Sequence, residues 1–189
     1  MDAIVEDCQR AVDTASSVIA LVGPEDLGRT TPCDLWDVRT LVAHMIWMCQ
    51  VFAGGLTGGD VPAEPPEVAD GADVLAAYRD AAAAAMEGWR TVDWADMTLQ
   101  LPFSKLPAAI GVRVFVGDAL IHSWDLATAL GQPFQIPEDL ARPQLELMEQ
   151  FYDPDNRGPQ AAFDLAADCP DGASTSDHLI ALSGRTLPI

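Results

Sequence analysis

The stretch Val114–Gly131, VFVGDALIHSWDLATALG, is the segment that the rest of the chain is expected to cover and complete. Its mostly apolar composition predicts a central helix, on which Asp118, His122 and Asp125 fall within a narrow arc at about 100° per residue. Burying carboxylates and an imidazole among apolar side chains is costly unless they pair, form hydrogen bonds or hold a metal. An aspartate and a histidine four positions apart are neighbours on a helix surface. The helix is therefore predicted to supply one half of a polar site.

A second predicted helix supplies a third candidate residue. Over residues 38–52, apolar side chains recur at the spacing of an amphipathic helix, and Asp37 stands at the N-cap position. His44 lies on the flank of this apolar stripe, about 120° from its centre. Because each helix of a bundle touches two neighbours, a flanking residue can still face the interior. His44, Asp118 and His122 are therefore predicted to meet inside a four-helix bundle.

The donor set of two imidazoles and one carboxylate would leave open positions on a tetrahedral or octahedral cation, an arrangement typical of catalytic metal sites. Spacing alone leaves two other interpretations open. In one, His122 forms a hydrogen bond with an aspartate of its own helix, and His44 is a half-exposed edge residue. In the other, the bundle is a metal-free scaffold.

The remaining sequence predicts further helices joined by polar connectors. Helical patterns cover four more stretches: residues 3–22, 73–89, 137–151 and, as a short helix, part of 175–189. Residues 54–71 are rich in glycine, proline and acidic residues and are predicted to form a solvated connector. Residues 97–103 alternate weakly and are predicted to be extended. Gly131 is expected to end the central helix.

The length of 189 residues fits one domain with a substantial core. We predict a single domain over residues 1–189, with its bundle core at about 1–131 and a C-terminal extension at about 132–189. The sequence shows no repeat with a period of roughly 20 to 50 residues, so a solenoid is not indicated.

The charge of the chain argues against two classes of partner. The 10 lysine and arginine residues against 29 aspartate and glutamate residues give a formal net charge of -19, which would repel nucleic acid backbones and anionic lipid surfaces. No apolar run approaches the roughly 18–20 residues of a membrane helix. Residues 1–20 lack a cationic secretion signal. We therefore expect a cytoplasmic protein with neither nucleic acid nor a membrane as partner.

The cysteines and tryptophans each have a simple structural interpretation. The cysteines are widely spaced and contain no CxxC pair, so we expect reduced thiols, most simply as small buried hydrophobes. Cys33 stands just before the second helix, which leaves a reactive thiol or an additional metal ligand open as alternatives. The tryptophans are expected to be core and interface anchors: Trp36, Trp47, Trp89, Trp94 and Trp124.

Three segments carry a resemblance to a known family. The stretches Thr31–Met45, TPCDLWDVRTLVAHM, and Asp118–Gly131, DALIHSWDLATALG, resemble the two signature segments of the DinB-like metal-binding bundle family. Within it they are most similar to the branch that includes mycothiol-dependent maleylpyruvate isomerase. Residues Leu179–Pro188, LIALSGRTLP, are similar to the small C-terminal helix of that branch, so the resemblance spans most of the chain.

The resemblance implies an all-α fold, a DinB-like up-down-down-up four-helix bundle with extra short C-terminal helices. It implies a divalent metal, zinc as first choice and nickel as the alternative, with His44, Asp118 and His122 as ligands. The third ligand in that branch is usually a glutamate. Asp118 is one methylene shorter, so the metal would sit closer to the helix or a water would bridge the gap. Asp125 is expected to support the ligands or hold helices together.

The implied activity is a metal-dependent reaction of a low-molecular-weight thiol, mycothiol or a similar one, with a small electrophile, in the manner of a transferase or isomerase. Maleylpyruvate isomerase carries an additional C-terminal domain, and this chain ends soon after the bundle, which counts against the isomerisation itself. The alternative is a non-catalytic metal-binding or stress-response protein of the same fold. Catalytic and thiol-binding residues are not assigned. Family members are often dimers, so a homodimer is left open beside the monomer.

Overall fold

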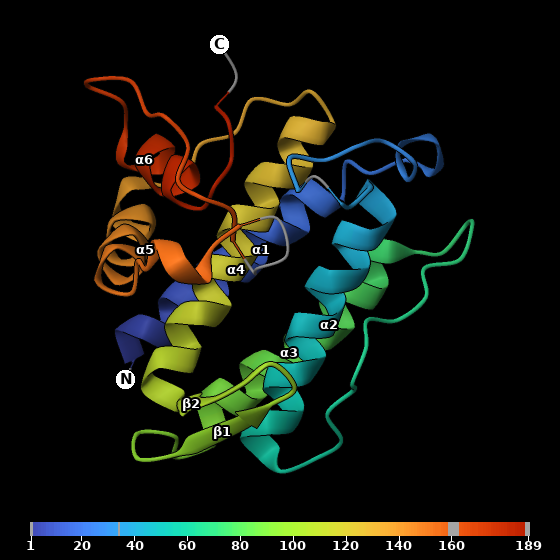
Figure 1. The fold of residues 1–189 in the computed structure, drawn as a ribbon. Coiled ribbons are helices and arrows are strands. Elements are labelled where there is room, and N and C mark those ends of the chain that lie inside the picture. Colours follow the sequence, from blue (N-terminus) through green and yellow to red (C-terminus); the bar gives the residue numbers. More distant parts are fainter. Residues whose placement is uncertain (1, 34, 159–162, 188–189) are drawn as a thin grey trace. The chain divides into compact units, whose positions relative to one another are not determined.

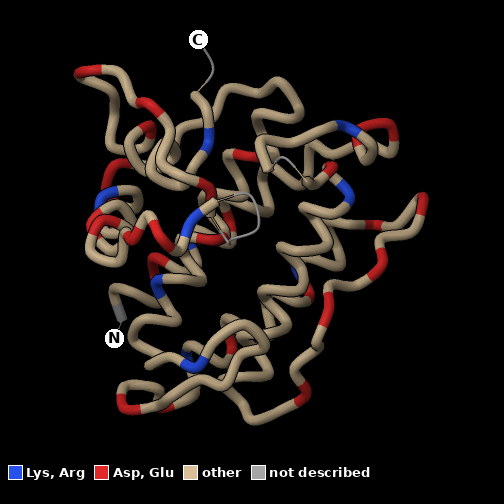
Figure 2. The backbone as a smooth tube through the Cα atoms, in the orientation of Figure 1, with Lys and Arg blue, Asp and Glu red and all other residues tan. Residues whose placement is uncertain are grey.

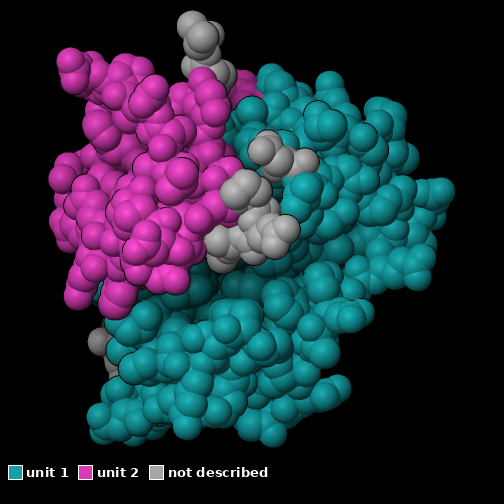
Figure 3. Space-filling model, viewed as in Figure 1, with its two compact units in different colours: residues 1–131 teal, residues 132–189 magenta. Residues whose placement is uncertain are grey.

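The computed structural model describes residues 2–33, 35–158 and 163–187. The helices and strands follow one another along the chain in this order: α1 (Asp2–Ile19), α2 (Val38–Thr57), α3 (Val74–Thr91), β1 (Thr98–Leu101), β2 (Ser104–Pro107), α4 (Ala108–Ala129), α5 (Glu138–Gln150) and α6 (Thr175–Leu182). Two short 3-10 helices, Pro24–Asp26 and Pro154–Asn156, lie in the connections. The chain divides into two compact units, residues 1–131 and 132–189 (Figure 3).

The first unit is a four-helix bundle. Helix α2 packs against α3 and α4, and α1 packs against the same two helices. Figure 1 shows α1 and α4 running in one direction and α2 and α3 in the opposite one, so the order is up-down-down-up. Because α2 and α3 are parallel, the connector 58–73 must return along the bundle before α3 begins. Acidic residues recur along this connector, as Figure 2 shows, which keeps it solvated.

Helix α2 forms much of the bundle core. It begins as predicted, because the side chain of Asp37 accepts a 2.8 Å hydrogen bond from the backbone N–H of Thr40 and caps the helix. Its buried side chains include Leu41, Met45 and Phe52. Within the described part of the chain, α2 is the one helix long and apolar enough to cross a membrane, and 61% of its apolar window is buried inside the protein.

The predicted start of the connector is wrong by several residues, because α2 continues through Gly54 to Thr57. A Cβ atom on Gly54 would lie 2.3 Å from the backbone oxygen of Asp60. The glycine is therefore needed for this close approach of the returning chain, not for breaking the helix. The helix ends at Gly58, whose φ of 69° is the left-handed conformation of a helix C-terminus.

A two-stranded hairpin precedes α4. The extended segment predicted over 97–103 forms β1, and its antiparallel partner β2 was not predicted. Leu99 on β1 is fully buried, and a Cβ atom on Gly111 of α4 would lie 2.7 Å from its side chain. The hairpin packs against α2 and α4 and so fixes where α4, the helix of Asp118 and His122, begins. Gly131, with a φ of 68°, follows the end of that helix as predicted.

The second unit contains the two further helices expected in the C-terminal part, α5 and α6, which pack on each other. The hydroxyl of Ser176 accepts a 3.0 Å hydrogen bond from the backbone N–H of Ile136. Ser174 caps α6 in a reciprocal arrangement with Asp177. Pro188, the last residue of the C-terminal resemblance, lies outside the described residues. The assignment of the chain to one domain stays a prediction.

Candidate metal centre

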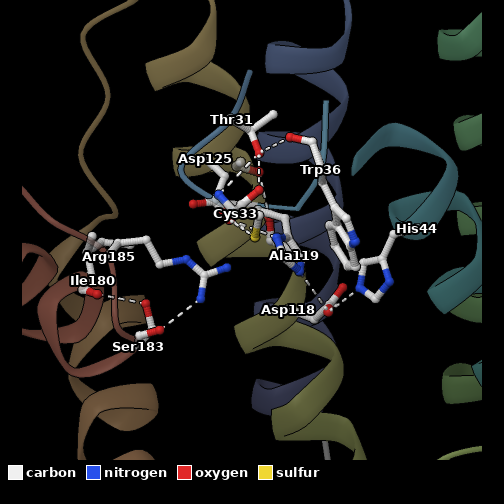
Figure 4. Close-up of polar contacts among 12 residues, drawn as sticks. Thr31, Cys33, Trp36, His44, Asp118, Ala119, Asp125, Ile180, Ser183 and Arg185 are labelled. Atoms are coloured by element: carbon white, nitrogen blue, oxygen red, sulfur yellow. Dashed lines mark hydrogen bonds and ion pairs between the residues drawn. The ribbon is translucent and has the colours of Figure 1, made fainter. Parts of the chain in front are cut away.

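The three predicted ligands come together between α2 and α4. Nε2 of His44 lies 3.0 Å from Oδ1 of Asp118, and Nε2 of His122 lies 3.5 Å from the same oxygen. Figure 4 shows His44 and Asp118 pointing toward each other from the two helices. One donor atom from each residue lies within 4.8 Å of the others. The side chains are 15%, 15% and 10% exposed for His44, Asp118 and His122, so the cluster is largely enclosed and still accessible.

These distances fit a bound cation. Nitrogen and oxygen ligands about 2.0–2.1 Å from a tetrahedral cation lie about 3.3 Å from each other. The two measured separations, 3.0 and 3.5 Å, lie on either side of that value. The carboxylate of Asp118 therefore reaches both rings despite its short side chain. Three protein donors would leave a fourth position for an external ligand, which is the arrangement of catalytic zinc sites.

Asp125 determines how the ring of His122 is used. Its Oδ2 lies 2.9 Å from Nδ1 of His122, and the Asp125 side chain has no exposed surface. A carboxylate at this distance favours the tautomer in which Nδ1–H donates to Asp125. The lone pair of Nε2 is then directed to the side where Asp118 lies, as a metal ligand requires. The position of Asp125 beside Nδ1 of His122 is compatible with the supporting role expected from the sequence.

Two tryptophans border the site, whereas three are core anchors. The ring of Trp36 lies 4.6 Å from that of His44 and 5.7 Å from that of His122, and the ring of Trp47 lies 5.8 Å from His44, between ring centroids. Trp89, Trp94 and Trp124 are buried in the core as predicted. The sequence alone does not distinguish the two groups of tryptophans, because the position of His44 on its helix does not predict which aromatic rings pack against it.

Hydrogen bonds among Thr31, Cys33 and Trp36 hold Cys33 and Trp36 beside the cluster. The hydroxyl of Thr31 accepts a 3.1 Å hydrogen bond from the backbone N–H of Cys33 and donates a 2.9 Å bond to the carbonyl of Trp36. The backbone N–H of Trp36 in turn donates to the carbonyl of Cys33 at 2.8 Å. The Cys33 thiol reaches Asp125, with 3.4 Å between Sγ and Oδ2 (Figure 4).

The negative charge of Asp118 contributes to the raised pKa values of two buried groups, the Cys49 thiol on α2 and the Tyr78 phenol on α3. Burial, followed by the negative charge of Asp118, raises the pKa of the Cys49 thiol well above its usual value. Burial and the neighbouring Cys49 and Asp118 likewise raise the pKa of Tyr78. The Tyr78 hydroxyl contacts Cys49 without reaching regular hydrogen-bond geometry. Both groups are therefore neutral at ordinary pH. Sequence reasoning missed Tyr78, which shows only as one more member of an apolar helix face.

Comparison with known proteins identifies relatives for most of the chain. The model of the family described as mycothiol maleylpyruvate isomerase N-terminal domain matches residues 8–127. Two uncharacterised proteins, from two strains of Mycobacterium tuberculosis, are each 32% identical over 179 residues, which is 95% of this chain and 96% of theirs.

Solved structures show the same fold. The crystal structure of the mycothiol-dependent maleylpyruvate isomerase aligns with a TM-score of 0.59 at 18% identity, over 76% of this chain and 67% of that chain. A mutant of that enzyme aligns with a TM-score of 0.60 at 16% identity and the same coverage. At this identity the likeness concerns the fold alone. The predicted all-α, DinB-like fold is thereby confirmed.

Proposed function

Because this chain belongs to the family of the mycothiol maleylpyruvate isomerase N-terminal domain, we propose that it is a metal-dependent enzyme that uses a low-molecular-weight thiol, mycothiol or a similar one. His44, Asp118 and His122 are the proposed ligands of a divalent cation. The reaction is the transfer of the thiol to a small electrophile or a thiol-assisted isomerisation. The alternative is a non-catalytic metal-binding or stress-response protein with the same ligands.

One observation carries the proposal: Oδ1 of Asp118 lies within 3.5 Å of Nε2 of both histidines, although the three residues come from two helices. Two imidazoles and one carboxylate suit zinc, and nickel is the alternative because imidazole also suits it. In this proposal Asp118 ligates directly, since its Oδ1 already lies 3.0 Å and 3.5 Å from Nε2 of the two rings.

The residues around the centre have separate tasks in this proposal. A divalent cation bound here supplies one effect, the lowering of the pKa of a coordinated thiol, so that a thiolate is available at neutral pH. Asp125 holds His122 in the ligating tautomer through the 2.9 Å contact at Nδ1. Trp36 and Trp47 shield one side of His44 from water and offer apolar surface to a substrate. The group that donates or accepts protons at the substrate is not assigned.

The proposal extends to the surroundings of the protein. The proposed partners are a small-molecule thiol and a small-molecule substrate. The net charge of -19 would repel nucleic acid and an anionic membrane, so neither is proposed as a partner. We place the protein in the cytoplasm, where low-molecular-weight thiols are kept reduced. A homodimer is the proposed assembly, on the likeness to the family, and its mass in solution is the direct test.

Elemental analysis of the purified protein tests the centre. We expect one bound divalent metal in the wild-type chain, and its loss in Asp118→Ala and in His122→Ala. The matched control is His178→Ala, since His178 is the third histidine of the chain, lies on α6 and is not a proposed ligand. Metal retained in both ligand variants, with a wild-type circular dichroism spectrum, overturns the ligand assignment.

A second experiment separates the enzyme from the alternative. Cobalt replaces the native metal, and mycothiol is added while the visible absorption of cobalt is followed. A changed spectrum shows that a coordination position is open to the thiol. An unchanged spectrum, at thiol concentrations that saturate known thiol enzymes, favours the non-catalytic alternative.

A further inference from the structure

A second group of metal-ligand side chains lies on the other nitrogen of the His122 ring. Cys33, His122 and Asp125 each offer one donor atom within 4.8 Å of the others. Sγ of Cys33 lies 3.4 Å from Oδ2 of Asp125, and that oxygen lies 2.9 Å from Nδ1 of His122. The proposed centre with His44 and Asp118 uses Nε2 instead. The two groups therefore occupy opposite edges of one imidazole.

The separations match a metal that includes sulfur among its ligands. With about 2.3 Å from zinc to sulfur and about 2.0 Å to oxygen, tetrahedral ligands lie about 3.5 Å apart. The Cys33 to Asp125 distance, 3.4 Å, agrees with this value, and the nitrogen to oxygen distance of 2.9 Å needs only a small opening. A thiolate, an imidazole and a carboxylate form a donor set that selects zinc or a softer divalent ion over magnesium or calcium.

The protein holds these donors in place before any cation binds. Both the N–H and the carbonyl of Cys33 are hydrogen-bonded, to the Thr31 hydroxyl at 3.1 Å and to the N–H of Trp36 at 2.8 Å. Asp125 and His122 are one turn apart on α4 and are both buried. Cys33 is only partly buried, unlike Cys8 and Cys49. Such prior ordering reduces the entropic cost of binding.

We propose that Cys33, Asp125 and Nδ1 of His122 form a second cation site for zinc or a softer divalent metal such as cadmium. Binding there forms bonds from the cation to sulfur, oxygen and nitrogen. It releases the proton of the Cys33 thiol to the solvent, whereas the Nδ1 proton of His122 moves to Nε2 when the first centre is empty and to the solvent when that centre is filled. With the first centre filled, the ring of His122 becomes an imidazolate that bridges two cations. The second cation consequently binds more weakly than the first, because the ring must lose a proton.

Cadmium titration of the full chain tests this site, because a cadmium–thiolate bond absorbs in the ultraviolet and bonds to nitrogen and oxygen do not. We expect wild-type protein to take up two equivalents and to develop the thiolate band. Cys33→Ser should lose the band and one equivalent. Cys169→Ser is the matched control, since Cys169 is the other partly buried thiol, and it should keep both.

A variant of the first centre separates the two proposals. His44→Ala removes a ligand that the second site does not use, so it should lose one equivalent and keep the thiolate band. If the wild-type band is absent, or survives in Cys33→Ser, the second site does not exist. If His44→Ala also loses the band, Cys33 ligates a shared single centre and the separate site is overturned. Circular dichroism of each variant checks that the fold is retained.

Alkylation gives an independent measurement that needs no spectrum. Cadmium should protect Cys33 from iodoacetamide and leave the modification of Cys169 unchanged, as followed by mass spectrometry of the digested protein. Equal rates for Cys33 with and without cadmium contradict ligation by its sulfur.

Discussion

Nε2 of His44 and Oδ1 of Asp118 lie 3.0 Å apart, although 74 positions separate the two residues in the sequence. The contact joins α2 to α4, two neighbouring helices of the bundle that run in opposite directions. Two such side chains meet only when both helices have the correct rotation and the correct axial position. The candidate centre is therefore a property of the packed bundle and is absent from any single segment.

Replacing Asp125 by asparagine should weaken metal binding at the first centre, whose three proposed ligands stay unchanged. The amide oxygen accepts from Nδ1–H more weakly than the carboxylate does over the 2.9 Å contact, and the amide NH2 group can instead donate to Nδ1 and favour the other tautomer. Loss of such a supporting contact typically lowers metal affinity by about 10–100-fold. Competition with a chelator measures the affinity, and Asp80→Asn, at an exposed position of α3, is the control. Equal affinities for Asp125→Asn and wild type would contradict the role given to Asp125.

Stability should fall in alkaline solution through the buried thiol of Cys8. Burial, with a smaller effect of Asp7, raises its pKa from 9.0 to about 12. Because the pKa is higher in the folded state, the full contribution to stability is present below pH 9 and is lost as the pH rises toward 12. At about pH 10.5 the loss is about 2 kcal/mol. Urea unfolding between pH 8 and 10.5 measures it, and Cys8→Ala should show a shallower decline.

Cys8→Ala also changes the packing of the core, which shifts the unfolding free energy at every pH. The variants are therefore compared by the slope of the unfolding free energy against pH. Cys169→Ala should keep more of the decline than Cys8→Ala does, because Cys169 is only partly buried whereas Cys8 is fully buried. Parallel slopes for wild type and Cys8→Ala would show that Cys8 does not titrate differently in the folded and unfolded states.

Alkylation should divide the four thiols into two classes in the folded protein. Cys8 and Cys49 are buried and their raised pKa values suppress the thiolate, which is the reactive form. Cys33 and Cys169 are partly buried and should react first. Mass spectrometry after brief treatment with iodoacetamide identifies the modified residues. Early modification of Cys49 would show that α2 opens far more readily than its burial indicates.

Replacing Gly54 by alanine should destabilise the protein, although helix propensity alone predicts the opposite. Alanine favours a helix interior over glycine by about 1 kcal/mol. The added Cβ atom, however, would lie 2.3 Å from the backbone oxygen of Asp60, so the returning connector must move. Overpacking of this kind costs about 1–3 kcal/mol. Thermal unfolding compares Gly54→Ala with Gly28→Ala, where nothing lies within 4 Å of the new atom.

A higher melting temperature for Gly54→Ala than for wild type would show that the connector yields at no cost. The same result would mean that propensity, and not the close approach of Asp60, controls this residue.

The sequence predicted what local periodicity and local chemistry determine. The apolar spacing over residues 38–52 indicated α2, and Asp37 indicated where it begins, because capping depends only on the next few residues. The ligand set was indicated by His122 and Asp118 on one helix turn. The prediction that His44 lies beside them required a helical bundle, and the apolar periodicity of the helices supports such a bundle.

Other features depend on contacts between distant segments and were not predicted. Gly54 reads as a helix breaker until Asp60 is known to pack against it. Strand β2 has no clear alternating pattern and forms because β1 offers a partner. The hydroxyl of Tyr78 on α3 lies near the thiol of Cys49 on α2. A tyrosine or a cysteine in an apolar stripe does not by itself predict such a contact.

Because α2 and α3 are parallel, a long connector joins them, and the chain can be cut there between two helices. A single cut in the solvated connector 58–73 would leave His44 on one fragment and both Asp118 and His122 on the other. Neither piece alone would hold the complete ligand set. If the proposed centre binds its cation, recovery of that binding on mixing would report that the two halves had reassembled.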